Sequence, residues 1–274
     1  MHKGSFYVNC AFYQGKGVIL EPSAEFTEFT APNVWPKETS LPCFQETFQE
    51  LCNLIIDVAA LVARACDRYA ASHTEDYELG YLERIVKTSK VTKARLLHYF
   101  PPSLSTADET QAVSQCQQSL RTSEHDSWCA THVDHGCLTG LTSAAYINES
   151  ALSPLSPIPG LVAQGSPLPV LPNLPLPPDP ETGLYIHARD STITKVSIPQ
   201  GCLGFQTGEA LQVITGGSFK AVPHFVRAPS GRGTAGVARN TLAVFTQPNL
   251  EDIVDKRRGT TFGEFSKEVI ARFS

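Results

Sequence analysis

From about residue 91 onward the chain is a succession of short segments rich in β-branched and aromatic residues, each ended by Gly, Pro or Asp. Such segments are typical of strands rather than helices. Many short strands joined by close turns indicate a sandwich or a jelly roll. The clearest segments are 94–100, 183–189, 194–199, 210–215, 224–228 and 241–247. The run TGGSF (215–219) separates two of them and predicts a tight hairpin turn.

The first 90 residues carry helical periodicity instead. Apolar side chains recur at steps of three and four, which predicts one face of a long helix over 46–71. The positions of that face are 48, 51, 55, 58, 62, 65 and 69. We expect it to pack against a sheet, because the pattern is too short for a coiled coil. A second helix is predicted over about 75–88, and Thr260 or Thr261 is a candidate cap for a short C-terminal helix.

Ten of the chain's 20 prolines fall between residues 154 and 180. Proline lacks a backbone donor and fixes φ, so this segment can form neither a helix nor a central strand. We expect a long, partly extended surface loop, inserted over 151–182. It could dock on the SH3-type groove of a partner, and a tolerated insertion between strands is the plainer alternative.

Composition argues against several classes of protein. A formal charge of −5 speaks against a nucleic-acid partner or an acidic membrane face. No apolar run approaches the ~20 residues that span a bilayer, and the N-terminus lacks the apolar core of a secretory signal. Eight cysteines without a CxxC pair are too dilute for a disulfide scaffold. They predict reduced, mostly buried thiols in a cytoplasmic protein, and we expect a monomer.

The triplet His132-Val133-Asp134 is the first candidate for chemistry. On a strand, residues i and i+2 share a face, so His132 and Asp134 can bind one metal ion while His135 points the other way. A third ligand must come from elsewhere, and His224 stands at the start of a predicted strand. Two histidines and a carboxylate leave three positions open on an octahedral metal, as in non-heme Fe(II) oxygenases. A polar strand end or a zinc hydrolase site are the alternatives.

Arg239 and Thr241 would share one face of a later strand, where they offer a guanidinium fork and a hydroxyl to a carboxylate. A cationic anchor beside an open metal site suits a 2-oxo dicarboxylic acid. Taken alone, Arg239 would be interpreted as one half of a surface salt bridge. Phe100, Trp128 and Phe205 are candidate walls of a substrate pocket, or equally members of the core.

Several short motifs occur together in the second half of the chain. They are Gly208-Glu209 before Leu211-Gln212, Thr215-Gly216-Gly217, His224-Phe225-Val226, Arg239-Asn240-Thr241, HVDHGCLTGLT (132–142) and RLLHYFPP (95–102). This combination resembles the 2-oxoglutarate/Fe(II)-dependent dioxygenases, more narrowly their isopenicillin-N-synthase-like branch. The closest resemblance is to a plant and algal type that carries a proline-rich insertion before GLY.

The resemblance implies a mainly β fold with flanking helices around a double-stranded β-helix, or jelly-roll, core. This dioxygenase domain would cover 91–274 and follow an N-terminal helical segment over 1–90. His132, Asp134 and His224 would bind Fe(II), and Arg239 and Thr241 would hold the distal carboxylate of 2-oxoglutarate. The implied reaction uses O2 to hydroxylate, desaturate or cyclise a small organic substrate and releases succinate and CO2. Ascorbate is a further expected cofactor, and no catalytic side chain beyond the metal site is implied.

The sequence departs from the family pattern in three places. His98 and Phe100 replace the Asn and second Tyr that help to orient the cosubstrate in relatives. The spacing from His224 to Arg239 is longer than usual, which indicates a hairpin extension over 228–236. The region before residue 91 is short, which indicates a truncated N-terminus. Two alternatives therefore stay open: an iron oxidase without 2-oxoglutarate, and a catalytically silent binding protein whose proline-rich loop recruits a partner.

Overall fold

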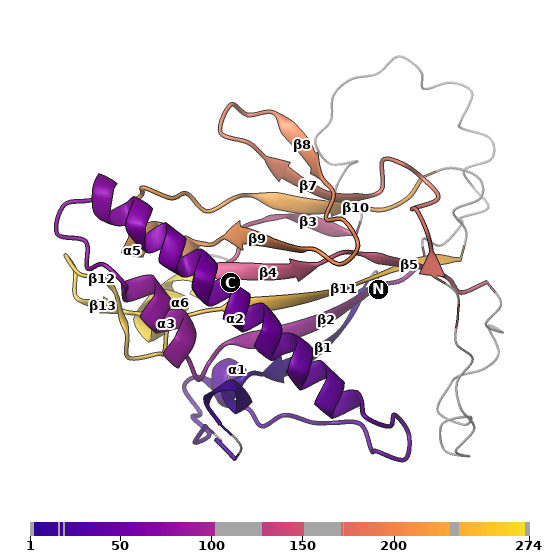
Figure 1. The fold of residues 1–274 in the computed structure, drawn as a ribbon, viewed down its shortest axis with the longest axis horizontal. Helices are drawn as coiled ribbons and strands as arrows, with labels where there is room; N and C mark the ends of the chain where they lie inside the picture. Colours follow the sequence, from indigo (N-terminus) through magenta and orange to yellow (C-terminus); the bar gives the residue numbers. More distant parts are fainter. Residues whose placement is uncertain are drawn as a thin grey trace.

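The computed structural model describes residues 3–271 apart from 16, 19, 102–127, 151–170, 172 and 231–235. Two antiparallel sheets face each other across an inner core, and helices cover the outer side of the larger sheet (Figure 1). The fold is therefore mainly β with flanking helices, as the succession of strand-like segments predicts. Most of the proline-rich segment and the centre of the predicted hairpin extension lie outside the described residues.

The larger sheet has the order β1, β2, β11, β4, β9, and β5 and β6 extend it beside one end of β11. Its strands are β1 (Lys3–Asn9), β2 (Lys93–Tyr99), β4 (Leu138–Thr142), β5 (Ala145–Asn148), β6 (Asn173–Leu174), β9 (Leu203–Thr207) and β11 (Val237–Thr246). Because β1 pairs with β2 along its whole length, residues 1–90 are not a purely helical segment. The division of the chain at residue 90 stays a prediction.

The smaller sheet has the order β3, β10, β7, β8. Its strands are β3 (Cys129–His132), β10 (His224–Arg227), β7 (Gly183–His187) and β8 (Ile193–Val196). A separate ribbon pairs β12 (Ile253–Asp255) with β13 (Thr260–Thr261). The remaining short elements near the N-terminus are the 3-10 helix η1 (Ala11–Gln14) and helix α1 (Thr27–Thr30).

Successive side chains of β11 point into two different cores. Leu242 and Val244 belong to the core under the helices, whereas Ala243 and Phe245 belong to the core between the sheets. This follows from the two-residue period of a strand. Strand β11 pairs with β2 on one side and with β5 and then β4 on the other. It is buried on both faces, and the predicted segment 241–247 covers only its second half.

Helix α2 (Phe44–His73) crosses the outer side of the larger sheet (Figure 1). The helix is confirmed, but the predicted face is only partly the buried one: Phe48 and Ile55 are buried, whereas Leu51 and Tyr69 are exposed. The face that packs consists largely of small side chains: Cys52, Ala59, Ala60, Ala63, Cys66 and Ala70. The helix lies so close that a Cβ on Gly140 of β4 would meet Cγ2 of Ile55 at 2.5 Å. Larger side chains at that interface would hold the helix away from the sheet.

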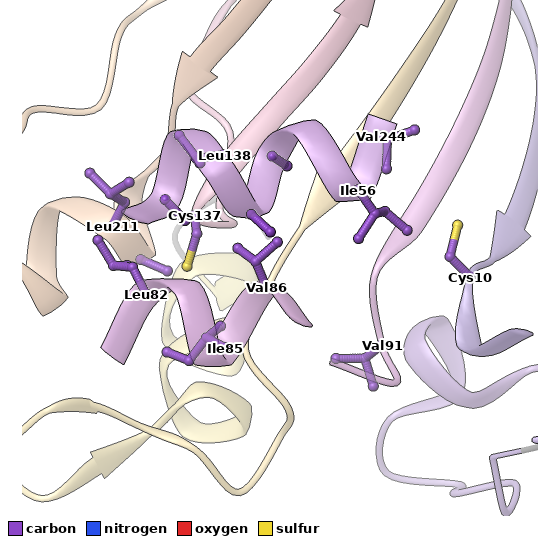
Figure 2. Packing of buried hydrophobic residues seen from close by; sticks show 14 of the residues in the cluster. Cys10, Ile56, Leu82, Ile85, Val86, Val91, Cys137, Leu138, Leu211 and Val244 are labelled. Carbon is purple, nitrogen blue, oxygen red and sulfur yellow. The ribbon is translucent and has the colours of Figure 1, made fainter. Parts of the chain in front are cut away.

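Helix α3 (Tyr81–Thr88) begins later than the predicted 75–88. Its N-terminus is capped by a residue of another helix, since the buried Asp67 carboxylate accepts the N–H groups of Leu82 and Glu83, both at 2.9 Å. The acidic residues from 75 to 78 therefore precede the helix instead of forming its first turn. Figure 2 shows the apolar side of α3 lying against Cys137, the residue directly before β4.

The predicted strand over 210–215 is wrong, because Glu209–Ile214 forms helix α5. Its first N–H groups bond to carbonyls of the loop after β3, from Glu209 to Asp134 over 2.8 Å and from Ala210 to His135 over 3.1 Å. Gly216 and Gly217 have φ values of 57° and 85°, which are typical of a helix C-terminus. The glycine pair that predicted a hairpin turn ends this helix instead.

Helix α6 (Phe262–Ala271) follows β13 directly. Thr261 caps it: its hydroxyl accepts the Glu264 N–H at 3.3 Å, and the Glu264 carboxylate accepts the Thr261 N–H at 2.9 Å. The cap prediction is confirmed at Thr261.

The described cysteines are free thiols, and Cys10, Cys52, Cys66 and Cys137 are buried, as expected. None of the helices in the described ranges has both the length and the apolar character needed to cross a bilayer.

Replacing Asp67 by alanine leaves two buried donors of α3 without partners. We expect a loss of about 2–4 kcal/mol in the free energy of unfolding, measured by urea denaturation. Asp57→Ala, on the exposed side of the same helix, is the matched control and should cost less than about 1 kcal/mol. Equal losses in the two variants would contradict the capping role.

Candidate metal centre and its cavity

His132 and His224 are cross-strand neighbours in the smaller sheet. His132 is the last residue of β3, His224 is the first of β10, and the two are paired in register. Their ring centroids lie 4.2 Å apart. Antiparallel pairing alone therefore brings together two imidazoles that are distant in the sequence.

Asp134 reaches the same point from the loop after β3. Because β3 ends at His132, strand alternation does not explain the position of this carboxylate. Hydrogen bonds hold it instead: the Thr139 hydroxyl donates to Asp134 Oδ2 over 2.6 Å, and the Gln206 amide does so over 3.1 Å. Asp134 Oδ1 faces Nε2 of His224 at 3.9 Å.

One potential ligand atom from each of His132, Asp134 and His224 lies within 4.8 Å of the others. Nδ1 of His132 is 2.8 Å from the carbonyl of Ala130, and Nδ1 of His224 is 3.1 Å from that of Val222. With a proton on Nδ1, each ring would donate to that carbonyl and leave its Nε2 lone pair available to a metal. Nδ1 of His224 also lies 2.6 Å from the amide nitrogen of Gln206. Burial lowers the pKa of His224, which favours the neutral ring that a metal requires.

The two cysteines that flank the triplet have different surroundings. Cys137 is buried in the core under the helices, so it does not contribute to the site. Cys129 Sγ lies 3.8 Å from Nδ1 of His132 and accepts a hydrogen bond from Lys3 over 3.3 Å. The hydrogen bond with Cys129 raises the pKa of His132. Cys129 therefore contacts a ligand candidate, whereas Cys137 does not.

Gly208 lets the loop that carries Asp134 dock against the start of α5. A Cβ at Gly208 would lie 2.3 Å from the carbonyl oxygen of Gly136 and 2.9 Å from that of Asp134. His135 is not one of the three ligand candidates, and its Nδ1 lies 3.1 Å from the carboxylate of Glu209. This contact agrees with the prediction that His135 points away from the metal site.

Arg239 is buried in the middle of the larger sheet, with 6% of its surface exposed. Its neighbours across the sheet are Tyr99 on β2 and Tyr146 on β5. Its guanidinium carbon lies 5.2 Å from the centre of the Tyr99 ring. Among the described residues, Nε and Nη1 of Arg239 have no hydrogen-bond partner. A buried cation with unpaired donors is costly, so this arrangement suits a bound anion.

Thr241 lines the cavity on the same face of β11, and its hydroxyl donates to the Thr142 carbonyl over 3.3 Å. Burial raises the pKa of the Tyr99 and Tyr146 hydroxyls, although Arg239 opposes this effect. Both phenols therefore stay protonated and can donate hydrogen bonds beside Arg239.

Phe100 has no hydroxyl, but the residue before it, Tyr99, is a tyrosine that lines the cavity. Strand β2 presents Tyr99 to the cavity, whereas His98 points to the opposite face and bonds to Asn240 Oδ1 over 2.7 Å. Phe100 lies after the strand and is 39% exposed. The motif RLLHYFPP indicates the right strand, and only the pairing with β11 shows which residue of it faces Arg239.

The candidate ligands of the metal and of the cosubstrate all line one cavity of about 560 Å³ between the two sheets. They are His132, Asp134, His224, Arg239 and Thr241. The predicted walls Phe100, Trp128 and Phe205 are not among its described lining residues. Trp128 is buried and donates from its indole to the Phe100 carbonyl over 3.0 Å, and Phe205 packs against the core under the helices. The observed walls include Leu184, Val196 and Phe245.

No family model matches the sequence, and no curated protein matches it. Among solved structures, the chain is similar to a full-length Neurospora crassa protein in complex with alpha-KG, with 16% identity and a TM-score of 0.59 over 99% of this chain and 66% of that one. A Caulobacter crescentus protein described as a 2OG-Fe(II) oxygenase family member gives 18% and 0.58 over 99% and 70%. JOX2 in complex with 2OG, Fe and JA gives 12% and 0.52 over 97% and 60%.

At these identities the similarity establishes the fold, which is the jelly roll of the 2-oxoglutarate oxygenases. The predicted fold class is therefore confirmed. The chain spans between 60% and 70% of the length of these three proteins.

Thr139→Val removes the shorter hydrogen bond to Asp134 without changing the size of the side chain. We expect the affinity for a divalent metal to fall by about 10-fold or more, because outer hydrogen bonds orient ligating carboxylates. Titration with Mn(II), followed by electron paramagnetic resonance, measures this. Thr142→Val, on the same strand, is the control and should leave the affinity unchanged; parallel losses in both variants would count against the role of Thr139.

Proposed function

We propose that the protein is a non-heme Fe(II)- and 2-oxoglutarate-dependent oxygenase that oxidises a small organic substrate and releases succinate and CO2. The observation that carries the proposal is the combination, in one cavity, of two imidazoles and a carboxylate with a buried arginine whose Nε and Nη1 have no hydrogen-bond partner among the described residues. The group of two histidines and an aspartate, or the buried arginine, could each serve another purpose if it occurred alone. Together they match a facial metal site and the anchor of a dicarboxylic cosubstrate.

In this proposal His132, Asp134 and His224 hold Fe(II) through two Nε2 atoms and a carboxylate oxygen. When bound, Fe(II), 2-oxoglutarate and O2 supply the oxidising chemistry. Arg239 binds the distal carboxylate of the cosubstrate, and Thr241 offers it a hydroxyl. The Tyr99 and Tyr146 hydroxyls can donate to the same carboxylate from either side of Arg239. The apolar walls exclude water from the reacting groups.

The finer assignments rest on the sequence motifs. We place the protein in the isopenicillin-N-synthase-like branch, near its plant and algal type, on the motifs at 208–212, 224–226 and 239–241. Use of ascorbate follows from the same resemblance. The free thiols of the described cysteines support a cytoplasmic location. Hydroxylation, desaturation and cyclisation are all compatible with such a site.

Anaerobic addition of Fe(II) and 2-oxoglutarate should give a weak visible charge-transfer band, because the oxo acid chelates the metal. We expect His132→Ala to abolish the band. If iron binds to the unmodified protein but no band forms, the cosubstrate assignment is wrong and a 2-oxoglutarate-independent oxidase or a silent binding protein is left. Release of succinate in air then distinguishes turnover from binding alone.

Arg239→Met should raise the dissociation constant for 2-oxoglutarate by at least about tenfold, because the distal carboxylate loses a charged, bidentate partner. Titration of the charge-transfer band measures this. Arg227→Met, on β10 and paired with Glu181, is the matched control and should leave the constant unchanged. An unaltered constant in Arg239→Met would remove this residue from the cosubstrate site.

A further inference from the structure

Two further cations line the same cavity, Arg95 on β2 and Lys195 on β8. The Arg95 Nε donates to Ser5 Oγ over 3.0 Å, and its guanidinium lies 4.9 Å from the centre of the Tyr7 ring. The Lys195 ammonium donates to the carbonyl of Pro180. Within the described ranges, neither side chain forms an ion pair with a carboxylate. In the part of the chain that the structure describes, both positive charges are therefore without a carboxylate counter-ion.

Arg95 is too far from Arg239 to belong to the cosubstrate anchor. On β2, Tyr99 pairs with Arg239 and Arg95 pairs with Ala243, so Arg95 lies four residues further along the strand. At about 3.3 Å per residue this is about 13 Å. In the row after Ala243, Phe245 pairs with Thr139, which holds Asp134. Arg95 thus lies toward the metal end of the cavity, at its β1 edge.

The charges of the loaded site leave Arg95 and Lys195 uncompensated. Asp134 is the sole carboxylate among the described lining residues of the cavity. If the proposed function holds, Fe(II) and Arg239 together balance Asp134 and the dianionic cosubstrate. Lys195 is exposed to solvent and Arg95 is half-buried. Arg95 is therefore the cation whose charge an anionic third ligand would compensate, whereas a neutral ligand would leave it without a partner.

Part of the remaining lining is apolar and suits an apolar body, beside polar side chains such as Asn173, Ser197 and Gln200. The apolar side chains come from both sheets and from the described end of the proline-rich segment. They include Leu174, Leu176, Leu184, Val196, Ile198 and Phe245. Strand β6 and the residues after it therefore form part of the cavity wall, instead of projecting only into solvent.

We propose that the substrate is a small carboxylic acid with an apolar body, and that Arg95 binds its carboxylate. The apolar body lies against the leucine, valine and isoleucine side chains that separate Arg95 from Lys195. Lys195 adds positive potential at the opposite wall and ties β8 to Pro180. Arg95 is then a specificity-determining residue for the proposed reaction.

The test uses 4-phenylbutyrate, an acid on an apolar body, and 4-phenylbutanamide, its neutral counterpart of the same shape. Metal-free protein that carries Arg239→Met is titrated with each, because neither iron nor the cosubstrate anchor can then attract the acid. Ligand-observed NMR gives the dissociation constants. We expect the acid to bind at least about tenfold more tightly than the amide, as expected for one charge-assisted contact.

Adding Arg95→Met should remove this preference without weakening the amide, and Arg95→Lys should retain part of it. Arg68→Met, on the exposed side of α2, is the matched control and should change neither constant. The proposal would be overturned by any of three results: equal affinities for acid and amide, no binding of either, or a preference that survives Arg95→Met. The charge-transfer experiment separates the two proposals: a band without acid preference rejects the substrate class alone, and acid preference without a band rejects the oxygenase alone.

Discussion

Strand β11 is paired on both edges and buried on both faces, and the other elements are arranged around it. One face of β11 packs under helix α2 through Leu242 and Val244, and the other face carries Arg239, Thr241, Ala243 and Phe245 toward the smaller sheet. A shift of one residue in its pairing would exchange these faces, placing the guanidinium under the helix and two aliphatic side chains in the cavity. The close packing of α2 against the sheet disfavours that shift, because a helix interface of small side chains has no room for an arginine. The packing of the hydrophobic core therefore also positions Arg239, the proposed cosubstrate anchor.

The site combines two kinds of positioning. The two histidines are set by backbone pairing between β3 and β10, which is insensitive to most side-chain changes. The carboxylate is set by side chains, through Thr139 and Gln206, and by the fit of Gly208 against its loop. Asp134 is therefore the ligand candidate whose geometry depends most on its surroundings. Substitutions around it should alter metal affinity before they alter the fold.

The residues of the site are predictable from the sequence, but their surroundings are not. His132, Asp134, His224, Arg239 and Thr241 stand in short motifs with fixed spacing, and the structure brings all five to one cavity. Strand register brings four further residues to the candidate site, and the sequence carries no local signal for that register. They are Thr139, Gln206, Tyr99 and Tyr146. The buried face of α2 agrees with the predicted one at Phe48 and Ile55 but not at Leu51 and Tyr69. The largest apolar residues define the expected face, whereas close approach to the sheet also brings small ones into it. The strand predicted at 210–215 fails because a glycine pair with positive φ suits a helix end as well as a hairpin.

We propose above that the histidines and Asp134 bind a metal in the same cavity where Arg239 binds the cosubstrate. A crystal structure with Mn(II) and N-oxalylglycine, an inert analogue of 2-oxoglutarate, tests this most directly. We expect one metal ion bound by Nε2 of His132, Nε2 of His224 and a carboxylate oxygen of Asp134, with the distal carboxylate of the analogue on Arg239. A metal bound elsewhere, or an analogue whose distal carboxylate does not contact Arg239, would contradict it.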